Sequence, residues 1–209
     1  MSHVPSSVNG VTTPALRRRP AQARSRARVE RIIAAAGELI GERGFEPVTL
    51  TDIAERADMA LTAVYRYFPN KQSVVRELAL QTFADDTDTL VATSTEFEGS
   101  IEELIVYGVN EFWRRHVGQP FRLQLRAAIH ADAELSALDL EESRRNARTI
   151  ARIVARSSGR TDVDILERQA LLVVELIDSL MRLAARVEPA AAEALLADFA
   201  AMVTRTFAG

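Results

Sequence analysis

The chain has 209 residues and a formal net charge of −3 at pH 7, a length typical of one domain or two small ones. It has no cysteine and only three histidines, which excludes thiol catalysis, cysteine-bound zinc and iron–sulfur clusters. No apolar run approaches the roughly 18 residues that a membrane-spanning helix needs, and the N-terminus lacks the apolar stretch of a signal peptide. We therefore expect a cytoplasmic protein without a bound metal or cofactor.

The charges are distributed unevenly along the chain. Residues 1–80 hold 12 basic and 8 acidic groups, a net charge of +4, whereas the remaining residues hold 14 basic and 21 acidic groups, a net charge of −7. A basic end on an acidic body is typical of a protein that touches phosphate with one end only. The alternative is a solvated arm whose charges contact nothing.

The first elements are predicted in chain order. Residues 1–15 carry no charged side chain, and we assign residues 1–20 to a disordered basic arm. Helical periodicity begins at about Ala21, and Gly41 and Gly44 provide a stop. The apolar stripe of this helix recurs at steps of three and four residues and comprises Val29, Ile32, Ile33, Ala36, Leu39 and Ile40.

The next segment has helix–turn–helix proportions. Thr49 is expected to cap a short helix, residues 57–60 form a turn, and Leu61 to Tyr67 form a second short helix. Asp58 occupies the turn position that needs a left-handed backbone. Asn70 can cap the helix that begins at Lys71. We expect a DNA-binding domain over residues 21–70 and a second domain over residues 71–209.

No strand signal occurs in the remainder of the chain. Helices are predicted at about 71–93, 101–117, 120–132, 136–157, 162–187 and 189–207. The predicted fold class is therefore all-α, with an N-terminal three-helix domain and a C-terminal helical domain.

The segments GERGFEPVTLTDIAERA and VYRYFPNK, within residues 29–79, resemble the tetracycline-repressor (TetR) family of transcriptional regulators. The resemblance implies that Leu61 to Tyr67 is a recognition helix in the major groove. Arg66 is the one side chain in this helix that can read guanine with two parallel hydrogen-bond donors. The alternative is that Arg66 contacts only the phosphate backbone of the DNA. The residues that the resemblance and the charge pattern place on DNA are Arg24, Arg28, Thr49, Thr51, Leu61, Thr62, Ala63, Tyr65, Arg66, Tyr67 and Lys71.

Three positions depart from the family pattern. Asp58 and Thr62 stand where the family often has glycine, and Ala60 stands where it often has serine. Loss of that serine removes a side-chain cap from the recognition helix. The basic segment from Arg17 to Arg28, which immediately precedes the first helix in this interpretation, is expected to follow the DNA backbone or enter the minor groove.

The C-terminal helices are apolar on two sides, which predicts a homodimer through a four-helix interface. The alternative is a helix fully enclosed in one subunit. The candidate interface residues are Leu166, Val173, Leu176, Ile177, Leu180, Leu195, Phe199 and Met202.

The resemblance implies a regulatory ligand among the central helices. Apolar walls with a few polar anchors are typical of such a pocket. For each residue taken alone, packing in the core is the more common role of aromatic side chains at helical spacing. The candidate pocket residues are Phe83, Tyr107, Gly108, Phe112, Trp113, Phe121, Gln124 and His130.

These observations predict a regulator that binds double-stranded palindromic operator DNA as a homodimer and is released by a small, largely apolar effector. It is expected to be a repressor, with an activator of the same fold as the alternative. Glycine-rich phosphate loops, nucleophile elbows and HExxH motifs are absent from the sequence, so an enzyme is not expected.

Overall fold

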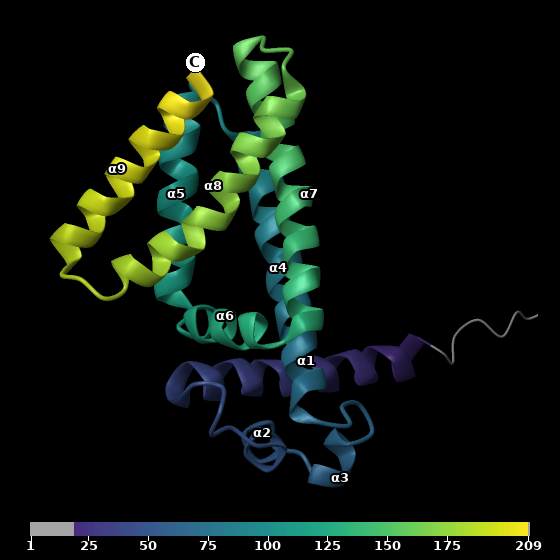
Figure 1. Ribbon diagram of the computed structural model, residues 1–209. Helices are drawn as coiled ribbons and strands as arrows, with labels where there is room; N and C mark the ends of the chain where they lie inside the picture. The colour runs from purple at the N-terminus through teal and green to yellow at the C-terminus, as the bar shows by residue number, and fades with distance from the viewer. Residues whose placement is uncertain (1–18, 209) are drawn as a thin grey trace, which may run out of the picture.

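The computed structural model describes residues 19–208, and within that range the chain forms nine helices and no strand (Figure 1). The all-α prediction is confirmed. The helices are α1 (Arg19–Arg43), α2 (Leu50–Arg56), α3 (Leu61–Val64), α4 (Lys71–Glu96), α5 (Ile101–Gly118), α6 (Phe121–Ala131), α7 (Ala133–Ser158), α8 (Val163–Ala184) and α9 (Pro189–Ala208).

Local sequence explains where the N-terminal helices begin. Thr49 caps α2 in a capping box with Asp52, and Asn70 caps α4 in a capping box with Ser73. Asp58 has φ +52°, so the left-handed turn that the sequence predicted is confirmed. These caps fix where α2 and α4 begin. Figure 1 shows α2 and α3 below α1.

The recognition helix is shorter than predicted. Regular helix covers only Leu61–Val64, and residues 65–67 form a turn. Ala60 makes no side-chain cap bond at its start, in agreement with the expectation drawn from the missing serine. A four-residue helix holds its shape mainly through packing, because isolated short helices are unstable in water.

One apolar core joins the N-terminal helices to the helices above them. Ile32 of α1, Ile53 of α2, Val64 of α3 and Val75 of α4 are all buried in it. The same cluster continues into α6 and α7 through Leu125, Ile129 and Leu135. The packing is thus continuous across residues 70 and 71, the predicted domain boundary.

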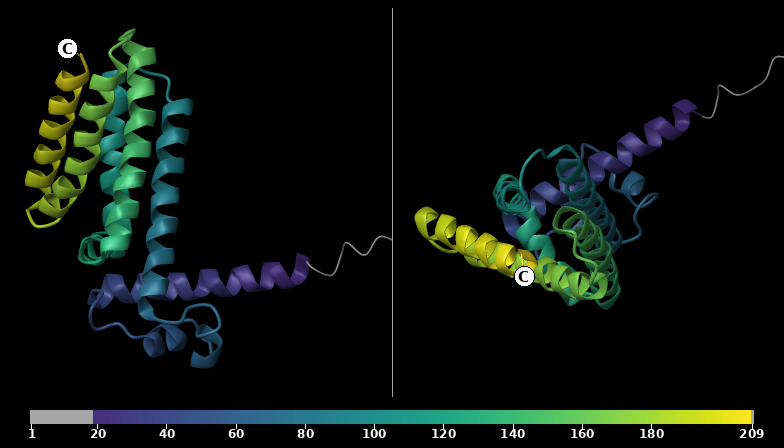
Figure 2. Two further views of the ribbon diagram at one scale, coloured as in Figure 1. Left: turned by 45° about the vertical axis from the view of Figure 1, so that its right-hand side comes forward. Right: turned by 90° about the horizontal axis from the view of Figure 1, so that it is seen from above.

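The upper part of the molecule is a bundle of long helices. Figure 2 shows α4, α5, α7, α8 and α9 standing side by side, with α1 lying below them; α1 contacts α4 and α6 of this upper part. A second apolar cluster, including Val109, Ala151, Leu166, Met181 and Phe199, holds α5, α7, α8 and α9 together. This bundle is continuous with the N-terminal module of α1, α2 and α3 through α4.

Candidate nucleic-acid interface and ligand cavity

The short helix α3 and the turn after it present three polar side chains to solvent. Thr62, Tyr65 and Arg66 are exposed, with Tyr65 52% exposed, while Val64 and Phe68 are buried on the opposite side. Leu61 and Ala63 are half-buried. The buried pair fixes the helix to the core, so the polar side chains face outward.

Helix α2 is held firmly on α1. Arg56 donates hydrogen bonds to the carboxylates of Glu38 (3.0 Å) and Glu42 (2.8 and 2.9 Å). The same guanidinium lowers the pKa of Glu42. Thr49 and Thr51, two predicted DNA contacts, are exposed at the start of α2, but the Thr49 hydroxyl accepts the backbone N–H of Asp52 and is already used as a cap.

Two predicted DNA contacts bind each other in the free protein. The Tyr67 hydroxyl is hydrogen-bonded to Arg28 and to Ser25 of α1, and the bond from Arg28 is the largest cause of the lowered pKa of Tyr67. Arg24 and Arg28 belong to helix α1, whereas the sequence analysis placed them on a basic arm before the first helix. Arg17 and Arg18 lie outside the described residues.

Lys71 contacts the loop between α1 and α2. Its ammonium donates hydrogen bonds to the carbonyl oxygens of Phe45 and Glu46, both at 3.0 Å, and lies 4.1 Å from the centroid of the Phe45 ring. This arrangement ties the start of α4 to the helix–turn–helix module. Two of the three ammonium donors are thereby occupied before any phosphate is present.

A cavity of about 230 Å³ lies among α4, α5, α6, α7, α8 and α9, slightly below the roughly 300–1,000 Å³ of typical ligand sites. Its walls are mainly apolar. They include Phe83, Leu90, Ile105, Val109, Phe112, Ile150, Val174 and Ile177.

Three of the eight predicted pocket residues line this cavity, namely Phe83, Gly108 and Phe112. A Cβ at Gly108 would meet no atom within 4 Å, so this glycine faces open space. The other five are not among the lining residues, because they project from other sides of the same helices.

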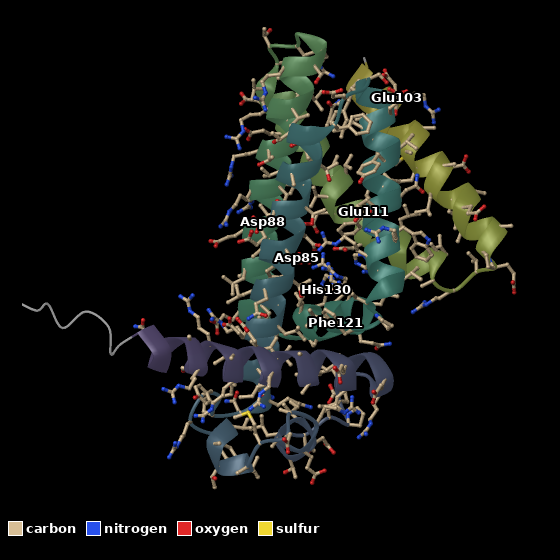
Figure 3. The ribbon with its side chains drawn as sticks, turned by 180° about the vertical axis from the view of Figure 1, so that it is seen from behind. Asp85, Asp88, Glu103, Glu111, Phe121 and His130 are labelled. Carbon is tan, nitrogen blue, oxygen red and sulfur yellow. The ribbon has the colours of Figure 1, made fainter. Side chains whose placement is uncertain are left out.

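Each of those five residues has a different environment. Tyr107 is exposed and its ring lies 5.7 Å from that of Phe97, and Trp113 packs against the second apolar cluster. Phe121 packs on Gly37 and Gly41 of α1. Gln124 and His130 are exposed on α6; Figure 3 shows Phe121 and His130 near the junction of α6 with α1.

Sequence reasoning missed the charged side chains of the cavity. Arg122 of α6 donates hydrogen bonds to Asp86 (2.6 Å) and Asp85 (2.7 Å) of α4, and Arg115 of α5 pairs with both carboxylates. Burial raises the pKa of Asp86, against the opposing effect of Arg122. The ion pairs thus connect α4, α5 and α6; Asp85 is labelled on α4 in Figure 3.

A second ion-pair group lies on the other side of the cavity. Arg126 of α6 pairs with Asp139 of α7 and with Asp178 of α8. Asp139 and Asp178 are each only 8% exposed. The sequence carried a signal for this ion pair, because Asp178 lies within a helix that is apolar on two sides. A charged side chain at such a position is rarely buried unless it is paired.

His116 is the one histidine that lines the cavity among the described residues. It is 4% exposed, and its Nδ1 lies 2.8 Å from the carbonyl oxygen of Phe112. Burial is the main cause that lowers its pKa to about 4, with smaller contributions from Arg122, Arg126 and Arg115. The ring is therefore neutral at pH 7.

The predicted dimer residues divide into two groups. Leu166, Leu180 and Phe199 are buried within the protomer, and Val173, Ile177 and Leu195 are half-buried against its second apolar cluster. Leu176 of α8 and Met202 of α9 remain exposed. The exposed apolar face of α8 consists of Ile165, Leu172, Leu176 and Leu183, so the stripe that the sequence analysis placed at an interface is largely internal core.

Two further features bear on the class of protein. Within residues 19–208 no group of three or more metal-binding side chains is gathered to hold an ion. None of the described helices is long and apolar enough to cross a membrane.

Family models match most of the chain. Residues 32–78 match the model described as "Bacterial regulatory proteins, tetR family", and residues 99–208 match the "Tetracyclin repressor-like, C-terminal domain". The uncharacterized HTH-type transcriptional regulator YdeS of Bacillus subtilis is 34% identical over 120 residues, 47% of this chain and 61% of that protein. The matched part thus spans less than two thirds of that relative.

Solved structures share the fold. A TetR-family transcriptional regulator from Streptomyces coelicolor has a TM-score of 0.66 and 24% identity, covering 86% of this chain and 96% of that one. GusR from Salmonella enterica has a TM-score of 0.68 and 18% identity, covering 87% and 95%. With its helix–turn–helix module, its helical body and both family models matched, the chain belongs to the TetR family of bacterial regulatory proteins.

Proposed function

We propose that this regulator is a repressor that binds a palindromic operator as a homodimer and is released when a small molecule enters the cavity. The observation that carries the proposal is the continuity of α4. The helix begins at the DNA-facing module, where Lys71 contacts the α1–α2 loop, and its later residues Asp86 and Leu90 line the cavity. A ligand that changes the position of α4 therefore acts on both ends of one rigid element.

DNA recognition is assigned to the exposed side chains of α3 and the following turn. Thr62, Tyr65 and Arg66 are the outward polar groups there, and Arg66 can donate two parallel hydrogen bonds to guanine. Arg28 and Tyr67 lie beside them and suit phosphate contacts. Since its target is chromosomal DNA, we place its action in the cytoplasm.

Dimerisation is assigned to the exposed apolar face of α8. Leu172 and Leu176 are 63% and 48% exposed, and a row of large apolar side chains on one helix face is a common docking surface in soluble proteins. A dimer that binds two half-sites must hold its two copies of α3 about one helical turn of DNA apart.

The oligomer is tested by sedimentation of Leu176→Glu, which places a charge on the proposed interface. The matched control is Val117→Glu, because Val117 is also exposed (58%) but belongs to α5 and not to the proposed face of α8. The wild type and the control should sediment as dimers and Leu176→Glu as a monomer. A monomeric wild type, or a dimeric Leu176→Glu, would contradict the assignment.

DNA binding is tested with the promoter region of the regulator's own gene, labelled and titrated with the full-length protein at two salt concentrations. We expect binding to a palindromic segment that is at least about 10³-fold tighter than to a scrambled duplex. Equal affinity for both would refute operator binding. A reporter gene behind that promoter should be expressed more strongly when the regulator is deleted, and lower expression would identify an activator.

A further inference from the structure

The positive and negative side chains that are buried in the cavity wall balance each other. They are Arg115, Arg122 and Arg126 against Asp86, Asp139 and Asp178, and none of these side chains is more than 19% exposed. Asp85, which also pairs with Arg122, does not line the cavity, and its side chain is 55% exposed. A charged ligand of either sign therefore meets no unpaired charge of opposite sign among these groups.

Two further acidic residues of the wall are paired with arginines at the surface. Glu111 pairs with Arg114 at 2.6 Å, and Glu142 pairs with Arg145 at 3.1 Å. A ligand charge that leaves water without a partner is costly. A ligand that displaces a wall carboxylate from its arginine leaves that carboxylate buried and unpaired. The wall thus favours an uncharged ligand.

His116 offers a ligand a hydrogen-bond acceptor. The carbonyl oxygen of Phe112 can only accept, so the Nδ1 atom beside it carries the proton and Nε2 of the neutral ring bears the lone pair. Within the described part of the chain Nε2 has no hydrogen-bond partner, although His116 is only 4% exposed and lines the cavity. The arginines that help to lower the pKa of His116 disfavour a cation at this atom. A neutral donor is free of that repulsion.

Ser143 of α7 is another buried polar side chain of the wall. It is 5% exposed and lines the cavity, and its hydroxyl forms no hydrogen bond to the rest of residues 19–208. A buried polar group without a partner costs free energy that a hydrogen bond to a ligand restores. The wall thus presents hydrogen-bonding groups to a ligand whereas its charges are already paired.

The polar and apolar parts of the wall lie towards opposite ends of the cavity. The buried ion pairs lie on α6 or beside it, and His116 lies in the last turn of α5, just before α6. Figure 1 shows α6 at the lower end of the bundle and the end of α9 at the upper end. The start of α5, the later part of α7 and the end of α9 contribute the apolar lining residues Ile101, Ile105, Ile150, Val154 and Phe207.

One ligand chemistry matches a neutral polar end and an apolar end. We propose that the effector of this regulator is a neutral, elongated alcohol, whose hydroxyl donates a hydrogen bond to Nε2 of His116 and whose apolar chain extends from α6 towards the end of α9. This inference rests on the proposed function, because it names the chemical class of the effector.

The test compares four probes of the same carbon number: n-octanol, its isomer 1-methoxyheptane, n-octylamine and n-octanoate. Affinity is measured by calorimetry on the full-length protein at pH 7, where the amine is a cation and the acid an anion. We expect octanol to bind at least about tenfold more tightly than each of the others. The ether accepts hydrogen bonds as octanol does but leaves Nε2 without a donor, and the two ions lose their hydration without gaining a free counter-charge.

Two results of this comparison would overturn the proposal. One is an ether or an ion that binds as tightly as octanol, and the other is the absence of octanol binding. Both are measured on the wild-type protein, so they do not depend on how well any variant folds.

His116→Phe locates the hydroxyl. Phenylalanine keeps a planar ring in the wall but has no acceptor nitrogen, so the advantage of octanol over its isomer should fall by about tenfold, to near equality. Both ligands are measured on the same variant, so a general change in packing affects them alike. His130→Phe is the matched control, since His130 is exposed on α6 and does not line the cavity, and it should keep the advantage. An undiminished advantage in His116→Phe would contradict the assignment.

A second measurement keeps the two proposals distinguishable. Operator binding is titrated with and without octanol. Octanol that binds with the expected preference but does not weaken DNA binding would contradict release by the ligand and leave the ligand chemistry of the cavity standing. Operator release by octylamine or octanoate and not by octanol would contradict the alcohol and leave release standing.

Discussion

Gly41 of α1 lies against the backbone of Phe121, the first residue of α6. A Cβ on Gly41 would sit 3.1 Å from the Phe121 backbone nitrogen and 3.5 Å from its Cα. The next residue, Arg122, extends into the cavity and holds Asp85 and Asp86 of α4. Two consecutive residues of α6 thus contact the DNA-facing module on one side and the ligand cavity on the other.

Gly41→Ala tests this contact. Replacing a helical glycine by alanine stabilises a helix by about 1 kcal/mol, but here the new methyl group meets backbone atoms that cannot rotate away. We expect the free energy of unfolding, measured with urea, to stay at or below the wild-type value.

Gly37→Ala is the matched control, one turn earlier on the same helix. Its Cβ would meet only the Phe121 ring and a Leu78 methyl group, at 3.6 Å or more, which is ordinary contact. This variant should therefore be more stable than the wild type by up to about 1 kcal/mol. Equal stabilisation by both substitutions would show that α6 is not held tightly at Gly41.

Features set by short-range rules were predicted from the sequence. The capping roles of Thr49 and Asn70 and the left-handed Asp58 follow from side chains that bond backbone groups a few residues away. Helical periodicity was predicted from about Ala21, and α1 is helical from the first described residue, Arg19.

The sequence was a poorer guide to which face of each central helix lines the cavity and which face packs in the core. Periodicity shows that α5 has an apolar face, but the choice between Gly108 and Tyr107 as cavity residues depends on which helices pack around it. The same limit explains α8, where two apolar stripes were found and the stripe containing Leu166 and Leu180 is the internal one. Sequence alone does not rank two apolar faces, because both are equally hydrophobic.

Arg66→Ala should relax sequence preference. If Arg66 reads guanine, its loss costs about 1–3 kcal/mol on the operator and much less on scrambled DNA. Affinity for both duplexes is measured by fluorescence anisotropy. Arg148→Ala is the control, because Arg148 is exposed on α7, away from α3. Equal weakening on the two duplexes would show that Arg66 contacts phosphate only.

Lys71→Met separates a structural role from a phosphate contact. Methionine keeps the length of the side chain but loses the two hydrogen bonds to the carbonyl oxygens of Phe45 and Glu46. We expect the free energy of unfolding to fall by about 1 kcal/mol and the salt dependence of DNA binding to stay unchanged. A salt slope reduced by about 1, with unchanged stability, would instead identify Lys71 as a phosphate contact.

His116→Gln should remove part of the acid sensitivity of the protein. The pKa of His116 is lowered from 6.5 to about 4, chiefly by burial, so below pH 6.5 the unfolded chain takes up a proton that the folded chain does not. The stabilisation is fully present above pH 6.5 and is lost as pH falls towards 4. Between pH 7 and pH 5 the wild type should lose about 2 kcal/mol of unfolding free energy more than His116→Gln. Asp86, whose pKa is raised, changes the free energy of unfolding with pH in the opposite direction. It does so in both proteins, so its effect cancels in the comparison.

His130→Gln, at an exposed position, should retain the wild-type pH dependence. If His116→Gln retains it as well, the imidazole does not stay neutral in the folded state.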